Sequence, residues 1–155
     1  MTDGTLIRFK FLVVFVFVGC GCHGSGSPSV NLTTAQKLSD SFMSDWVAHR
    51  ADAAFDEMEP EFTGTVTRAE FAVQFEKLSQ YCGWPLDSEL KHVENGTKVY
   101  LDGHTNSIRK FTYAATTTQY PKGQCYFSIE VAPSGKSAKV TTFGPLRVTS
   151  GNPFP

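Results

Sequence analysis

The stretch TRAEFAVQFEKLSQYCGWP, residues 67–85, contains every signal that defines one complete helix. Thr67 and Glu70 have the spacing of a capping box, in which each side chain bonds the backbone N–H of the other residue. Four apolar residues follow at helical spacing and predict one buried face: Phe71, Phe75, Leu78 and Cys82. Gly83 and Pro85 then end the run. We therefore predict a helix that ends at Cys82 and forms one wall of the core.

A longer helix is predicted upstream, over residues 34–49. Thr33 and Gln36 form a weaker capping box ahead of it. Polar residues occupy one side of this helix, and a broad apolar stripe occupies the other, made of Leu38, Phe42, Met43, Trp46 and Val47. This stripe predicts a second wall of the core.

A short helix is predicted between these two, over residues 53–58. Asp52 is its expected N-cap, and Pro60 is expected to end it, because a proline disfavours helical geometry in the residue before it. Residues 61–66 are then a connector anchored by Phe62. The fold therefore begins with three helices.

After Pro85 the pattern changes to alternation of apolar and polar residues, which is typical of antiparallel strands. Residues 86–101 are either one long strand or a hairpin that turns at Asn95-Gly96, and the sequence leaves both open. Three further strands are predicted, over residues 108–120, 124–132 and 137–148, the last broken at Gly144-Pro145. Their turns are predicted at residues 102–104, 121–123 and 133–135. This order predicts an α+β domain with three helices on one face of a curved antiparallel meander.

The N-terminus has the features of a targeting segment. Arg8 and Lys10 precede an apolar run over residues 11–18, which has the length of a signal-peptide core and is too short to span a bilayer. The following residues, Phe17-Val18-Gly19-Cys20, resemble a bacterial lipobox, although Phe17 stands where leucine is usual. The resemblance implies that Cys20 is acylated and becomes the mature N-terminus.

This resemblance implies an exported protein that a lipid anchor holds at the bacterial cell envelope. Its location would be the outer membrane or the periplasmic face in a Gram-negative host. Cys22 is a weaker acceptor, and a plain secreted or membrane-tethered form is the alternative. The chain then divides into a signal peptide, a flexible Gly/Ser tether, one domain and a tail, over residues 1–19, 20–31, 32–150 and 151–155.

Cys82 and Cys125 remain once Cys20 and Cys22 are assigned to the lipid and the tether. An exported domain lies in an oxidising compartment, where two such thiols usually pair. Both lie on faces that the pattern directs into the core, because Cys125 alternates in step with Phe127, Ile129 and Val131. We therefore predict a disulfide between them. The four histidines are scattered and no C-x-x-C is present, so we expect no metal and no cofactor.

The charge of the chain argues against a nucleic-acid partner, because the formal net charge is only −1. The charges are nonetheless segregated: acidic residues dominate residues 40–89, and residues 91–147 are mostly basic. The acidic segment over residues 52–61 is therefore a candidate protein-partner surface, and a solvated acidic loop is the alternative.

The order of elements also resembles a known superfamily. A first helix that contains Trp46, a short acidic second helix and a capped third helix ending at Gly83 precede the strands. This order is similar to that of the cystatin-like, nuclear-transport-factor-2-like superfamily, which includes small exported bacterial domains of unknown function, and it covers about residues 33–148. The resemblance implies a cone with an apolar pocket between helices and sheet, lined here by Phe42, Trp46, Phe71, Phe75, Tyr113 and Phe127.

Two functional hypotheses follow. Relatives of this kind bind small ligands in the pocket or, in isomerase-like members, move a proton with a carboxylate or histidine and a hydroxyl donor. The titratable or hydroxylic candidates on regular elements are Asp45, His49, His92, Tyr113 and Glu130, and no motif assigns a catalytic role to any of them. We therefore expect a non-enzymatic domain that binds a protein partner or a small apolar ligand. A small isomerase- or dehydratase-like enzyme that uses the pocket is the alternative.

Overall fold

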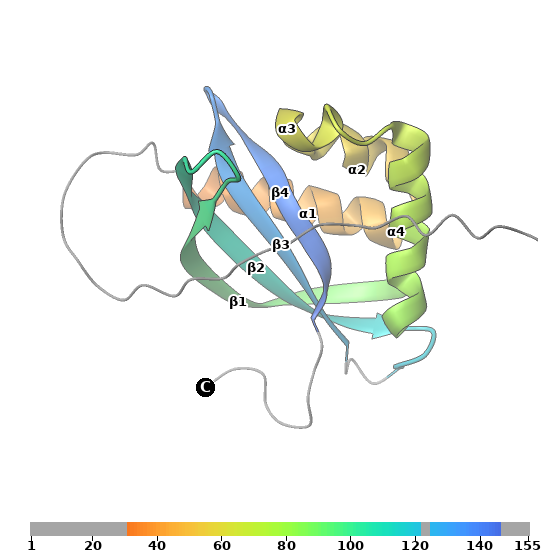
Figure 1. Ribbon diagram of the computed structural model, residues 1–155. Helices are drawn as coiled ribbons and strands as arrows, with labels where there is room; N and C mark the ends of the chain where they lie inside the picture. Colours follow the sequence, from red (N-terminus) through yellow and green to blue (C-terminus); the bar gives the residue numbers. More distant parts are fainter. Residues whose placement is uncertain (1–30, 122–124, 147–155) are drawn as a thin grey trace, which may run out of the picture.

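The computed structural model describes residues 31–121 and 125–146, which form four helices followed by four strands. These are α1 (Leu32–Val47), α2 (Ala51–Glu57), α3 (Pro60–Thr63), α4 (Arg68–Cys82), β1 (Pro85–Val99), β2 (Thr105–Thr117), β3 (Cys125–Ser134) and β4 (Ser137–Leu146). Each strand pairs antiparallel with the next, so the sheet has the order β1-β2-β3-β4 and is not closed (Figure 1). The predicted α+β class with an antiparallel meander is confirmed.

The helix α4 has the signals that its sequence predicts. The Thr67 hydroxyl accepts a hydrogen bond from the Glu70 N–H at 3.3 Å, and the Thr67 N–H donates to the Glu70 carboxylate at 2.8 Å. Gly83 has a φ of 78°, and a Cβ on it would lie 2.5 Å from the Thr118 hydroxyl oxygen. Only glycine therefore fits at the end of this helix without displacing its neighbours.

The starts of the first two helices differ from the prediction. The side chain of Asn31 accepts a hydrogen bond from the Thr33 N–H at 2.8 Å, so α1 begins at Leu32 and the Thr33 capping box was wrong. The helix α2 begins at Ala51 instead of Ala53, because the backbone N–H of Arg50 bonds the Asp45 carbonyl at 2.8 Å and the chain turns at once.

Pro60 begins a helix instead of only ending one. It occupies the first turn of α3, where a proline costs nothing because the N–H groups of that turn lack a helical partner. The segment predicted to be a connector, residues 61–66, is therefore helical in part, and the predicted count of three helices was wrong by this single turn.

The strand β1 is continuous through Asn95-Gly96, so the hairpin alternative is excluded. These two residues pair with Arg109 and Ile108 of β2. A Cβ on Gly96 would lie 3.2 Å from the Ile108 side chain, so the glycine leaves room for that neighbour within the sheet. The chain turns instead after Tyr100, whose carbonyl accepts a hydrogen bond from the Gly103 N–H at 2.9 Å.

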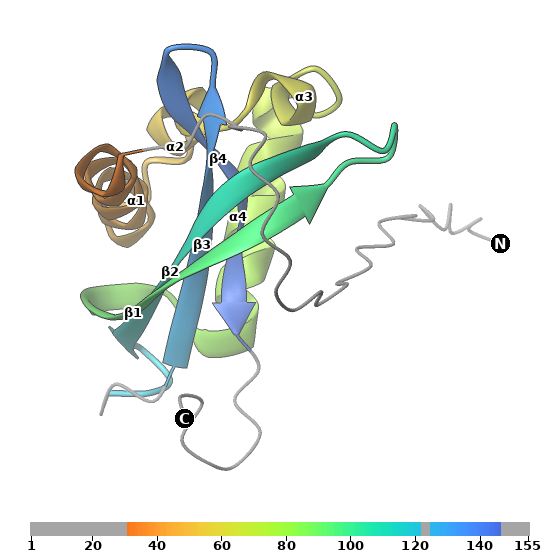
Figure 2. The same cartoon turned by 90° about the vertical axis from the view of Figure 1, so that its left-hand side faces the viewer.

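The hairpin of β1 and β2 is longer than the rest of the sheet. Pairing between β2 and β3 begins at Arg109, whereas pairing between β1 and β2 continues to Val99 and Thr105. Residues 96–108 are therefore a two-stranded ribbon with its turn, which we call the arm, and Figure 2 shows it projecting from the rest of the sheet.

The final hairpin is tighter than predicted. The strand β3 continues through Pro133 and Ser134, and the turn is the two-residue loop Gly135-Lys136, with a φ of 59° at the glycine. The strand β4 is not broken at Gly144-Pro145, which pairs with β3. A proline is tolerated there because β4 lies at an edge of the sheet.

The core lies between the sheet and the helices, and Trp46 is at its centre. Its ring centroid lies 5.3 Å from that of Phe75, 4.8 Å from that of Phe127 and 5.4 Å from that of Phe143. The predicted inward face of β3 is confirmed, because four alternating residues are buried: Cys125, Phe127, Ile129 and Val131. The helix α1 contacts all four strands, and α4 contacts α2 and β4.

Candidate functional site

A cleft opens between α1 and the strand β1, and its volume is about 350 Å³. Two charged and two hydroxyl side chains lie around it, together with three apolar residues and one tyrosine. The lining residues are Asp40, Met43, Ser44 and Val47 of α1, Asp87, Ser88 and Leu90 of β1, and Tyr113 of β2.

Both elements present these side chains for local reasons. On α1 the cleft residues recur at the i, i+3, i+4 and i+7 positions that share one helix face. On β1 the segment Asp87–Leu90 lies between two irregularities of pairing, one after Pro85 and one before His92. Such bulges bend a strand and redirect its side chains. The cleft therefore lies at the one short run of β1 that pairs regularly between these bulges.

Tyr113 joins the two walls of the cleft. Its hydroxyl donates to Asp40 Oδ1 at 2.7 Å and lies 2.8 Å from Ser39 Oγ. Burial raises the pKa of Tyr113, and the neighbouring Asp40 carboxylate raises it further. The phenol therefore stays protonated at physiological pH and acts as a donor that fixes Asp40.

The cleft has an apolar floor and an acidic rim. Met43 and Tyr113 are buried, whereas Asp40, Ser44 and Asp87 are exposed. Such a site suits a ligand that has an apolar stem and a positive charge. It lacks a buried base, because Asp40 is exposed to water and already accepts the Tyr113 proton in a hydrogen bond.

The residues predicted to line an apolar pocket have a different place in the structure. Tyr113 lines the cleft, but the other five lie in the core with 0–1% of their surface exposed: Phe42, Trp46, Phe71, Phe75 and Phe127. Phe143 of β4, which the sequence analysis did not single out, fills the space between them. Its ring centroid lies 4.9 Å from that of Phe42 and 5.6 Å from that of Phe71.

The other titratable candidates are not brought together. The Asp45 carboxylate is 2.6 Å from the Arg50 guanidinium, and the His49 ring centroid is 3.9 Å from that of Trp84. His92 and Glu130 pair with Thr112 and Lys110 of β2, so they lie on the opposite face of the sheet from Tyr113. No proton-transfer site assembles from this set.

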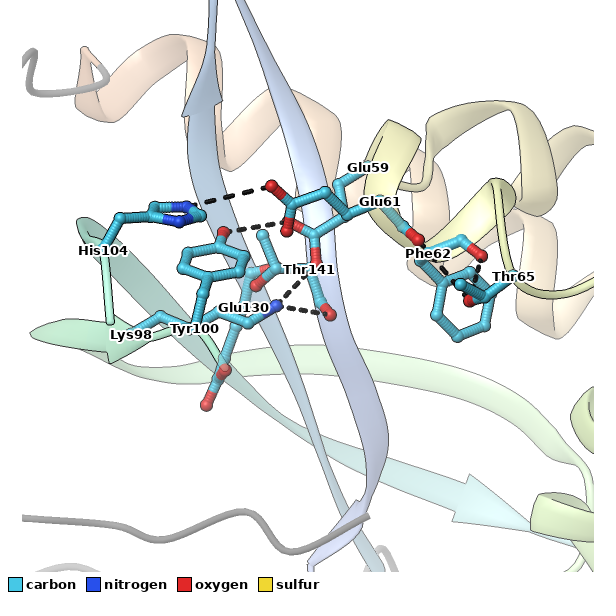
Figure 3. A network of polar contacts seen from close by, with 9 residues as sticks. All are labelled: Glu59, Glu61, Phe62, Thr65, Lys98, Tyr100, His104, Glu130 and Thr141. Atoms are coloured by element: carbon cyan, nitrogen blue, oxygen red, sulfur yellow. Dashed lines mark hydrogen bonds and ion pairs between the residues drawn. The ribbon is translucent and has the colours of Figure 1, made fainter. Parts of the chain in front are cut away.

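A second polar cluster binds the arm to the helical layer (Figure 3). The buried Glu59 carboxylate accepts hydrogen bonds from Lys98 Nζ at 2.5 Å and from the Tyr100 hydroxyl at 2.9 Å. Burial raises the pKa of Tyr100, and Glu59 contributes to the shift. His104 stacks on Tyr100 and lies 3.8 Å from the Glu61 carboxylate. These groups satisfy one another's hydrogen-bonding capacity and hold the arm against the helices. We call the cluster of Glu59, Glu61, Lys98, Tyr100 and His104 the clasp.

Ion pairs within the chain involve part of the acidic segment over residues 52–61. Within the acidic segment over residues 52–61, Asp56 pairs with Arg68 and Glu59 pairs with Lys98. The Lys139 ammonium also donates to the Asp56 carbonyl at 2.7 Å. Two of these carboxylates are therefore paired within the same chain, Glu59 by Lys98 of the basic half and Asp56 by Arg68 of α4. A partner surface over this segment stays a prediction.

The predicted cysteine pairing is confirmed. The Cys82 and Cys125 sulfurs are at bonding distance, and their Cα atoms are 6.2 Å apart, within the range that a disulfide requires. The predicted lipid site Cys20, the signal peptide and most of the tether lie outside the described residues, as does the tail over residues 151–155.

No group of three or more histidine, cysteine or acidic residues in the described ranges is arranged to hold a metal ion. None of the helices α1 to α4 is long and apolar enough to cross a membrane. No model of a known protein family matches the chain, and no curated protein matches it. The cleft is therefore the feature of the described residues that bears most directly on function.

Proposed function

We propose that this protein is a lipid-anchored domain of the bacterial cell envelope that binds a ligand in the α1–β1 cleft without catalysing a reaction. The observation that carries the binding proposal is the cleft of about 350 Å³, which lies beside a filled aromatic core. Its apolar floor and acidic rim provide complementary contacts but no base poised for proton transfer. The anchoring proposal is supported by the lipobox-like residues before Cys20.

The relationship to cystatin-like domains belongs to the same proposal. The helices precede an open antiparallel meander, as in that superfamily, which supports the relationship. The ligand site proposed here differs from a cone pocket, because it lies at the edge of the sheet beside β1.

An isomerase- or dehydratase-like activity is the second candidate function. The observation that favours it is the hydrogen bond between Tyr113 and Asp40, because a protonated phenol beside a carboxylate is one half of a proton-transfer site. The exposure of Asp40 favours binding instead, since proton-transfer sites usually exclude water from the reacting groups.

A photoreactive amino acid at position 44 tests the binding site in living cells. Ser44 is exposed on the rim of the cleft, so we expect a defined crosslinked species there. The matched control is the same amino acid at Val73, which is 50% exposed on α4 and outside the cleft. Equal yields at both positions, or none at position 44, would contradict ligand binding in this cleft.

Acylation is tested separately by Cys20→Ala, which removes the predicted lipid acceptor. We expect this variant to accumulate as an unprocessed precursor that no longer incorporates labelled palmitate. Cys22→Ala is the control and should be labelled like the parent. The reverse pattern would move the lipid to Cys22, and labelling of neither parent nor variants would exclude the anchor.

A further inference from the structure

The two edges of the sheet differ in how the described residues cover them. The edge strand β4 is covered at its middle: Met58 forms a parallel bridge with Val140, and the Glu59 N–H donates to the Val140 carbonyl at 2.9 Å. Lys98 of the arm also donates to the Thr141 carbonyl at 3.3 Å. Along β1, by contrast, no strand within residues 31–121 and 125–146 pairs with the outer edge.

The outer edge of β1 offers backbone groups to another strand. Alternate residues of an antiparallel edge strand direct their N–H and C=O groups away from the sheet. Such an edge pairs indiscriminately unless proline, bulges or charges limit it. The strand β1 begins at Pro85, has two pairing irregularities and carries charged side chains at Asp87, Glu89, Lys91, Glu94 and Lys98. It is therefore protected against non-selective pairing, and among the described residues it is left open to a matching strand.

The cleft lies directly along this open edge. Its β1 wall is the run Asp87–Leu90, and its other wall is α1. A strand added to β1 would lie about 4.8 Å from it, because this is the spacing of paired strands. Alternate side chains of that strand would then point toward α1 and enter the cleft. Backbone pairing and side-chain pockets are the two components of recognition by strand addition.

The lining of the cleft selects the side chain that enters. Met43, Val47 and Leu90 contact an aliphatic stem well, while the carboxylates of Asp40 and Asp87 lie on opposite walls at the rim. Lysine and arginine combine an aliphatic stem with a positive head group. An acidic side chain would be repelled by both carboxylates.

We propose that the ligand is an extended segment of a partner protein that adds to the outer edge of β1 as a further strand and inserts a lysine or arginine between Asp40 and Asp87. This inference rests on the proposed function and specifies its ligand. Main-chain bonds to β1 supply affinity that does not depend on sequence, and the acidic cleft supplies selectivity for one basic residue.

Selection of a random peptide library on the purified full chain, held in detergent micelles, tests the inference. The enriched peptide is then synthesised and becomes the probe for all binding measurements. We expect one basic residue within alternating β-branched residues, and we expect its replacement by glutamate to weaken binding at least about tenfold. The Asp40→Asn/Asp87→Asn variant should remove this preference, since asparagine keeps the shape of the cleft and an acceptor for Tyr113.

Two further changes test separately whether the cleft is the binding site and whether the peptide binds by strand addition. Ser44→Trp fills the cleft and should weaken binding at least about tenfold, whereas Val73→Trp on α4 should leave it unchanged. Methylation of alternate backbone nitrogens of the probe should weaken binding to a similar degree in one of the two registers. Each variant is checked for folding by circular dichroism.

Four outcomes overturn a specific claim. Binding that survives Ser44→Trp removes the cleft as the site, and with it the proposed function. Binding that is lost in Ser44→Trp but survives methylation in both registers keeps the cleft and overturns strand addition. Peptides that keep their affinity when the basic residue becomes glutamate overturn the charge selectivity. A library that yields no peptide above the Ser44→Trp background overturns a peptide ligand altogether.

Discussion

The Cys82→Ser/Cys125→Ser variant should lose up to about 4 kcal/mol of unfolding free energy relative to the oxidised protein. The bond joins the end of α4 to the start of β3 across 43 residues of sequence, so its loss frees a long loop in the unfolded chain. This loss is a large part of the roughly 5–15 kcal/mol that stabilises a typical domain. Urea titration should show a lower midpoint and an equal or steeper slope, because the unfolded chain without the crosslink exposes at least as much surface, and the far-ultraviolet dichroism of the folded state should stay the same.

Reduction provides the internal control for this prediction. A thiol reductant should destabilise the parent protein by a similar amount and leave the double variant unaffected. Cys22→Ser, which alters the predicted tether, should have parental stability. A double variant as stable as the oxidised parent would show that the bond contributes nothing, and a reductant effect on the double variant would assign the loss to another cysteine.

Local signals were sufficient for α4 because capping box, apolar face and terminal glycine agree over one short stretch. They were insufficient at the first two helix starts. Asn31 and Thr33 are both good N-cap residues, and the choice between them depends on where α1 must begin to reach the core. Pro60 is compatible with the end of one helix or the start of another, and the sequence around it does not distinguish these roles.

The strand β1 illustrates a limit of turn signals. Asn95-Gly96 is a strong hairpin pair, yet both residues remain in the ladder. The deciding contact is with Ile108 on the neighbouring strand, whose side chain occupies the space that the glycine leaves. A single sequence does not reveal that contact, because it depends on the register of the whole hairpin.

The cleft was predicted only at Tyr113. Hydrophobic periodicity identifies which faces are buried, but it does not show whether the space between two buried faces is filled or hollow. Phe143 contributes to the filling of this space, because it is partly buried and packs against the aromatic core. Asp40 and Asp87 are ordinary surface residues by pattern, and only the folded chain brings them to the rim of one cleft. The clasp was missed for the same reason, since Glu59 and Lys98 are distant in sequence.

Trp46→Ala should destabilise the domain by about 3–5 kcal/mol, the range for large aromatic truncations in a packed core. The side chain is fully buried, and its indole N–H donates to the Ser79 hydroxyl at 3.3 Å. Truncation leaves a cavity among Phe75, Phe127 and Phe143 and removes the donor to the Ser79 hydroxyl, which keeps its own bond to the Phe75 carbonyl. Because the expected loss approaches the total stability of a small domain, the milder Trp46→Phe variant should be measured beside it by urea titration.

The chain supplies a matched control, because Trp84 is its other tryptophan. Trp84 is only half-buried and its ring lies against the exposed His49, so Trp84→Ala should cost clearly less than Trp46→Ala. Equal losses would show that Trp46 is not the centre of the core. The Trp46→Phe variant also separates the core from the binding site. Trp46 does not line the cleft, so the enriched peptide should bind this variant with parental affinity. A large loss of peptide binding in a folded Trp46→Phe protein would instead show that the aromatic core residues contribute to the binding site.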